Sequence, residues 1–190
     1  MPISYFEEKT FDKLDFSVNP LTKGEYENCT FINCIFSNTH ISGFVFSECT
    51  FKGCNLSSAH LAATALKDIQ FKDCKLLGIH FENCNPFLFS VAFESCILNL
   101  SSFYKVNLKK TRFIDCSLHE VDFTEADLGQ SLFDGCDLAK ATFERTVLEK
   151  ADFRTSYNYA IDPETNRIKK ARFSKDGIIG LLHKYDIAIE

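Results

Sequence analysis

The sequence of 190 residues contains no tryptophan, one methionine and four prolines. It also lacks a basic N-terminal flank followed by an apolar core, which is the pattern of a secretory signal. The longest uncharged stretch, residues 28–47, is interrupted throughout by Asn, Ser, Thr and His, so no segment resembles a membrane-spanning helix. We therefore expect a cytoplasmic protein without a membrane partner.

Positive charge is not in excess, because 21 Lys and Arg face 26 Asp and Glu and give a net charge of -5. Direct nucleic-acid binding is therefore not expected, since it needs a basic surface that neutralises many phosphates. Hydrolase, metalloprotease, P-loop and dinucleotide motifs are also missing from suitable contexts. We expect no catalytic residue, no cofactor and no metal site, and we keep an enzyme only as a third option.

What the sequence does have is phenylalanine, with 20 residues of this type, placed on a five-residue period. At 45% hydrophobic residues, apolar residues at all 25 successive positions of this five-residue period would arise by chance with a probability of roughly two in a billion. A period of five fits neither a helix nor a strand, so each unit is predicted to be a short extended step followed by a corner. The predicted centres are Phe31, Phe36, Ile41, Phe46, Phe51, Leu56, Leu61, Leu66, Phe71, Leu76 and Phe81, then, after a slip of two residues, Leu88, Phe93, Leu98, Phe103, Leu108, Phe113, Leu118, Phe123, Leu128, Phe133, Leu138, Phe143, Leu148 and Phe153.

A second period of 20 residues gives the length of one full coil. Cys34, Cys54 and Cys74 are 20 apart, and the Phe ladder that begins at Phe31 follows the same rule. Four pentapeptides per coil predict a square solenoid whose coils pair in parallel at about 4.8 Å. All nine cysteines lie two residues before a position of the five-residue register, which for Cys84 is Pro86, so we expect reduced, buried thiols.

The units Ala126-Asp127-Leu128, Cys136-Asp137-Leu138 and Ala151-Asp152-Phe153 resemble the consensus of the pentapeptide repeat proteins. The resemblance covers residues of about 25 to 155 and implies an all-β fold, a right-handed quadrilateral parallel β-helix. We expect this β-helix to span residues 1–173, with an irregular first coil over 1–28 and a modified last coil over 156–173.

A two-residue insertion near residues 85–87 interrupts the pattern and contains Pro86 and Phe87. Two interpretations are open: a small loop that contacts a partner, or an insertion tolerated at one corner.

Residues 174–190 are expected to form a C-terminal module. Ser174 can cap a short helix over about 175–185, and Ile187-Ala188-Ile189 is expected to form a strand. One alternative is a cap that covers the last coil; the other, which we favour, is a homodimer through this module. The candidate dimer residues are Ile178, Ile179, Leu181, Leu182, Tyr185, Ile187 and Ile189.

This tail is similar to that of the quinolone-resistance (Qnr) group, and residues 161–168 resemble the microcin immunity group of McbG. The resemblance implies a DNA-mimicking rod that engages DNA gyrase or topoisomerase IV and modulates drug or toxin action. Outward carboxylates at Asp115, Asp134 and Asp152 are the candidate contacts. The long projecting loops of the Qnr group are absent. The alternative function is a generic interaction scaffold without a topoisomerase partner.

His40, His60 and His80 form an outward ladder at the 20-residue spacing. Stacked imidazoles could bind a transition metal or titrate together near neutral pH. Parallel side chains converge poorly on one ion, so a metal site is not expected.

Overall fold

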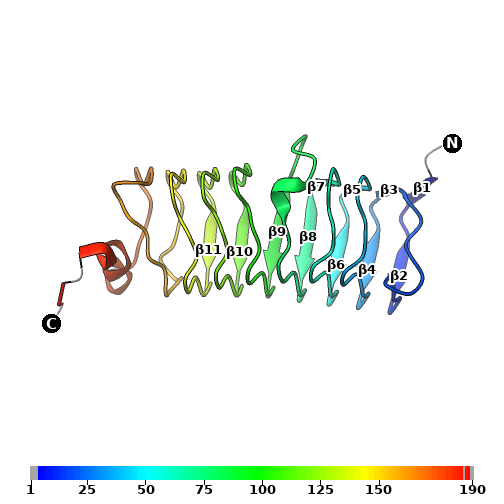
Figure 1. Cartoon of the computed structure of the whole chain (residues 1–190), viewed down its shortest axis with the longest axis horizontal. Coiled ribbons are helices and arrows are strands. Elements are labelled where there is room, and N and C mark those ends of the chain that lie inside the picture. Colours follow the sequence, from blue (N-terminus) through cyan, green and yellow to red (C-terminus); the bar gives the residue numbers. More distant parts are fainter. Residues whose placement is uncertain (1–3, 186, 189–190) are drawn as a thin grey trace.

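The computed structural model describes residues 4–185 and 187–188. The chain winds as a parallel β-solenoid whose coils follow one another along a rod, with the N-terminus at one end and the C-terminus at the other (Figure 1). A four-stranded sheet has the order β1-β3-β5-β7, formed by Ser4–Glu7, Gly24–Glu27, Val45–Ser47 and Ala65–Lys67. A seven-stranded sheet has the order β11-β10-β9-β8-β6-β4-β2, formed by Leu132–Asp134, Arg112–Ile114, Val91–Glu94, Ile69–Lys72, Thr50–Lys52, Thr30–Ile32 and Thr10–Asp12.

Strand register confirms the 20-residue coil. In the seven-stranded sheet Phe11 lies opposite Phe31, and Phe31 opposite Phe51. The first coil already follows this register, because β1 pairs with β3 from Ser4 opposite Gly24 onwards. The right-handed winding and the four-sided cross-section stay predictions.

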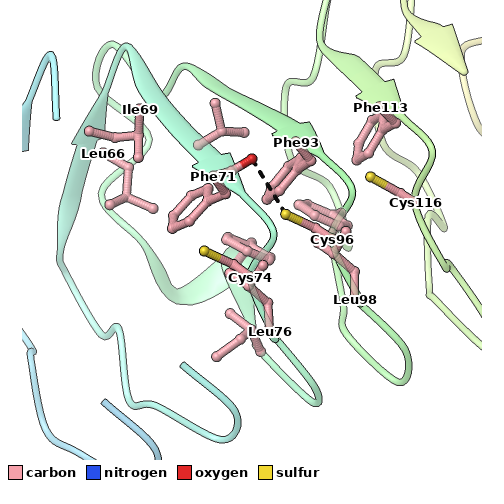
Figure 2. Close-up of a cluster of buried hydrophobic side chains, with 14 of the residues drawn as sticks. Leu66, Ile69, Phe71, Cys74, Leu76, Phe93, Cys96, Leu98, Phe113 and Cys116 are labelled. Carbon is pink, nitrogen blue, oxygen red and sulfur yellow. Dashed lines mark hydrogen bonds between the residues drawn. The ribbon is translucent and has the colours of Figure 1, made fainter. Parts of the chain in front are cut away.

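The core consists of the predicted centres, stacked one coil above another. Phe113 is fully buried, with ring centroids 5.2 Å from Phe93 and 4.8 Å from Phe133. Figure 2 shows Phe71, Phe93 and Phe113 in this column, with Cys74, Cys96 and Cys116 beside it. Every predicted centre except Leu88 is buried, so the pentapeptide period is confirmed as the pattern of the core.

The prediction for Leu88 is wrong, because this residue is 63% exposed. Ala65 still lies opposite Asn85, 20 residues on, whereas Ile69 lies opposite Val91, 22 residues on. The slip therefore lies between Asn85 and Val91, after the 3-10 helix η1 (Phe81–Asn83). Leu88 takes a left-handed corner conformation with φ of 56°, which turns its side chain out of the core.

Corners repeat with the same period, and their residues have positive φ. Two of them are glycines with a second constraint, Gly53 and Gly135, each at φ of 63°. A Cβ on either one would collide with the side-chain oxygen of the residue stacked one coil below, Asn33 or Asp115. Glycine avoids the backbone strain that other residue types bear at the remaining corners, and it leaves space for the stacked side chain.

The C-terminal helix differs from the prediction of one helix over 175–185. Two short 3-10 helices are present, η2 (Asp176–Leu181) and η3 (His183–Tyr185). Ser174 lies one residue before the N-cap of η2, Lys175, and its Oγ accepts a hydrogen bond from the backbone N–H of Gly177 at 2.9 Å. Of the predicted strand, Ile187 and Ala188 are not in a strand, and Ile189 lies outside the described residues.

Close packing against the last coil explains why this segment forms short 3-10 helices rather than one longer α-helix. A Cβ on Gly180 would collide with the backbone oxygen of Tyr159, and Ile161 N–H donates to the Gly180 carbonyl at 3.0 Å. Lys184 Nζ then contacts Asp162 Oδ1 at 2.8 Å and Glu164 Oε2 at 2.6 Å. The glycines that permit this contact also weaken an α-helix, at about 1 kcal/mol each.

Candidate partner-binding surfaces

The nine cysteines are all buried and free, and they belong to the core. Seven of the thiols donate to a backbone carbonyl one coil below: for example, Cys96 Sγ lies 3.4 Å from the Phe71 oxygen (Figure 2), and Cys136 Sγ lies 3.3 Å from the Phe113 oxygen. Thr64 and Ser101 occupy the same position and donate in the same way. Because Cys, Ser and Thr occupy this position and make the same hydrogen bond to the backbone, we assign the cysteines a structural role and not a catalytic one.

We expect native thiols to be inert toward a water-soluble disulfide reagent at pH 8. Burial raises the pKa of Cys49 and of Cys84 to about 12, so almost no thiolate is present at these two. The hydrogen bond with Cys74 lowers the pKa of Cys54, but this thiol, like all nine, is buried away from the reagent. A thiol assay should detect none in the folded protein within minutes and all nine after denaturation. Rapid reaction of several thiols in the folded state would contradict the structural assignment.

The carboxylates expected to contact a partner differ in their surroundings. Asp115 and Asp134 are exposed on consecutive coils, and Thr155 Oγ1 donates to Asp134 Oδ1 at 2.7 Å. Asp152 is half-buried between Arg154, at 2.8 Å, and Arg172, at 3.5 Å. The hydrogen bonds from Arg154 lower the pKa of Asp152, so this carboxylate is charged but neutralised by its neighbours.

Ion pairs between successive coils neutralise other carboxylates in the C-terminal half. Glu125 contacts Lys105 at 3.5 Å and Arg145 at 2.9 Å, and Arg167 contacts Glu149 at 2.7 Å. The hydrogen bond from Arg145 lowers the pKa of Glu125. In the part of this half that the structure describes, cations therefore interrupt the acidic surface.

The least neutralised acidic surface lies at the other end of the rod, on the face of β1, β3 and β5. We call it the N-terminal carboxylate patch: Glu7, Glu8, Glu25, Glu27 and Glu48. Glu7 and Glu27 lie directly opposite each other in the strand register. Tyr5 donates its hydroxyl to Glu27 Oε2 at 2.5 Å, which raises the pKa of Tyr5 to about 12. Within residues 4–185 no Lys, Arg or His forms an ion pair with these five.

The density of negative charge is higher in this patch than over the rod as a whole. Three coils span about 14 Å, over which duplex DNA carries about eight negative charges, so five carboxylates approach that density. The whole solenoid does not, since its net charge is -5. Our sequence interpretation missed the patch, although the 20-residue offset of Glu7 from Glu27 is the signal that identifies it.

The histidine ladder is only partly formed. The rings of His40 and His60 stack with centroids 4.3 Å apart, whereas His80 Nδ1 contacts Glu82 Oε1 at 2.9 Å. Because the two rings are nearly parallel, their nitrogens do not converge on one point where a metal ion could bind. Among the described residues, no group of three or more His, Cys, Asp or Glu is arranged to hold a metal ion. The same residues include no helix with the length and apolarity to cross a membrane.

The apolar residues expected at the dimer interface are divided between the core and the surface. Leu181 packs against the core and Leu182 is half-buried. Ile178, Ile179, Tyr185 and Ile187 are each more than half exposed. Ile189 lies outside the described residues. At the slip, Pro86 is exposed and Phe87 is 66% exposed.

Comparison with known proteins identifies the repeat. The family model for the pentapeptide repeat region matches residues 25–86 and 87–157, which is most of the chain. The chain belongs to the pentapeptide repeat family. No curated protein sequence matches it significantly.

Solved structures of similar fold include those of QnrB1, a plasmid-mediated fluoroquinolone resistance protein. A trypsin-treated variant of QnrB1 matches with a TM-score of 0.69 at 19% identity, covering 98% of this pentapeptide repeat chain and 92% of QnrB1. Full-length QnrB1 matches with a TM-score of 0.55 at 19% identity, covering 97% of this chain and 100% of the QnrB1 chain. At this identity the likeness shows the fold.

Proposed function

We propose that this pentapeptide repeat protein binds a type II topoisomerase, DNA gyrase or topoisomerase IV, and modulates its inhibition by drugs or toxins. The observation that carries the proposal is the end-to-end match to QnrB1, a fluoroquinolone resistance protein, which extends over 98% of this chain and so includes the C-terminal module. The protein acts through its surface as a non-enzymatic DNA mimic in the cytoplasm.

Electrostatics support the N-terminal carboxylate patch as the main mimic of DNA. An enzyme surface that binds duplex DNA is basic, and it attracts five closely spaced carboxylates as it attracts phosphates. Asp115 and Asp134 form a second contact, and Asp152 contributes less because Arg154 and Arg172 neutralise it. Pro86 and Phe87 contact the same partner from the slip.

A two-fold homodimer through the C-terminal module is part of the proposal. Ile178, Ile179, Tyr185 and Ile187 are exposed. The C-terminal segment that contains them lies at one end of the rod (Figure 1), where a second copy covers them in the proposed dimer. Closed two-fold symmetry is the common arrangement for such a self-complementary surface.

Supercoiling assays test the function. We expect the purified protein to inhibit gyrase supercoiling at micromolar concentration or to relieve inhibition by a quinolone. Neutralising the patch in the triple variant Glu7→Gln, Glu25→Gln, Glu48→Gln should weaken the effect about tenfold, since three unpaired charges are lost.

The matched control removes three carboxylates that already have cationic partners and lie outside the slip: Glu125→Gln, Glu144→Gln, Glu149→Gln. It changes net charge equally and should weaken the effect by less than about threefold. No effect of the wild type on either topoisomerase would favour the alternative, a generic interaction scaffold.

A further inference from the structure

A groove lies in the seven-stranded sheet next to the two-residue slip. On the outward side of β9, Ala92 lies between Gln70 of β8 and Arg112 of β10. Because Ala92 is small, two hollows of about 180 and 220 Å³ open there, and both are lined by Gln70, Ala92 and Arg112. The hollows therefore join into one open groove that runs along the strand.

An apolar projection stands at one end of this groove. The segment between η1 and β9 rises out of the rod (Figure 1), and it exposes 66% of Phe87 and 63% of Leu88. Ser90 joins this loop to the neighbouring coil, since its Oγ donates to Asp68 Oδ1 at 2.8 Å. The projection and the groove are thus held in one place, beside each other along the chain.

The charges around the groove favour an anionic occupant. Lys110 and Arg112 are exposed, and within the described part of the chain neither forms an ion pair. Of the two nearby carboxylates, Glu94 is neutralised by Lys72 at 3.3 Å, whereas Asp68 accepts from the neutral hydroxyl of Ser90 and keeps its charge. Two unpaired cations therefore face one unpaired carboxylate. A locally cationic groove is unusual on a protein whose net charge is -5.

We propose that the slip surface, formed by Phe87, Leu88, Ala92, Lys110 and Arg112, docks an extended acidic segment of the protein partner. The groove is open along a strand, which suits an extended chain, and the projection supplies apolar contact for one of its side chains. Two unpaired cations are too few to hold duplex DNA, which needs many phosphate contacts. The inference rests on the proposed function, which supplies a topoisomerase as the partner.

Binding of immobilised protein to purified gyrase and to topoisomerase IV tests the docking site. Ala92→Tyr fills the groove without touching the core, and Arg112→Glu reverses its charge. Each should raise the dissociation constant at least about tenfold. Arg112→Lys keeps the charge and should stay within about threefold of wild type.

Controls use the same sheet two coils toward the N-terminus. Thr50→Tyr and Lys52→Glu make matched changes at outward positions that line neither hollow, and these variants should bind like wild type. Circular dichroism and the melting temperature identify any variant that fails to fold. A labelled DNA duplex that binds the wild type but not Arg112→Glu would overturn the acidic-segment assignment.

The two proposals fail in different ways. Wild-type binding with unaffected Ala92→Tyr and Arg112→Glu variants overturns the docking site and leaves the topoisomerase function standing. Absence of wild-type binding to both enzymes overturns the proposed function and, with it, this docking role.

Discussion

We expect Phe113→Ala to lower the free energy of unfolding by about 3–5 kcal/mol, because the lost ring leaves a cavity in the middle of the core. Phe113 is fully buried, stacked between Phe93 and Phe133 and in edge contact with Phe103 and Phe123. Its neighbours are fixed by their own coils, so they cannot collapse into the space. Chemical and thermal unfolding measure the loss.

Arg112→Ala provides the matched control, since it lies on the same strand β10 but is exposed. It should change the free energy of unfolding by no more than about 0.5 kcal/mol. A loss below about 1 kcal/mol for Phe113→Ala would mean that the ring does not fill the interior.

The second large effect concerns the oligomer. We expect the wild type to have twice the mass of one 21.6 kDa chain in light scattering, and Ile178→Asp to have the mass of one chain. Ile178 is 52% exposed in one copy, so a charge there leaves the isolated fold intact but would be buried without a partner in a dimer. Apolar side chains contribute about 1.5–3 kcal/mol each on full burial, which is enough to drive association.

Val18→Asp makes the same kind of change at the opposite end of the rod, where Val18 is 71% exposed, and should leave the mass unchanged. Leu182→Asp is a less clean variant because Leu182 is half-buried in the single chain. A wild-type mass of one chain at about 50 µM would contradict the dimer and leave the module as a cap.

The carboxylates show how far sequence reasoning extends to the candidate site. Asp152 fits the outward pattern as well as Asp115 does, yet Arg154, two residues later, and Arg172, 20 residues later, both lie close enough to neutralise it. The same stacking places Glu7 beside Glu27 without a cation. The same 20-residue spacing therefore places a cation beside one carboxylate and a second carboxylate beside the other, so the identity of the stacked residue contributes to the local charge.

The sequence by itself determined the coil length, the inward positions and the family, because only a side chain repeated every five residues can fill a solenoid of 20-residue coils. The tertiary structure decided the exceptions. Leu88 lies outside because the pairing resumes at Val91, and the C-terminal segment forms 3-10 turns because Gly177 and Gly180 pack directly against Tyr159. The core pattern is local and repeats along the chain, whereas a slip, an ion pair or a cap depends on which residues the neighbouring coil brings within reach.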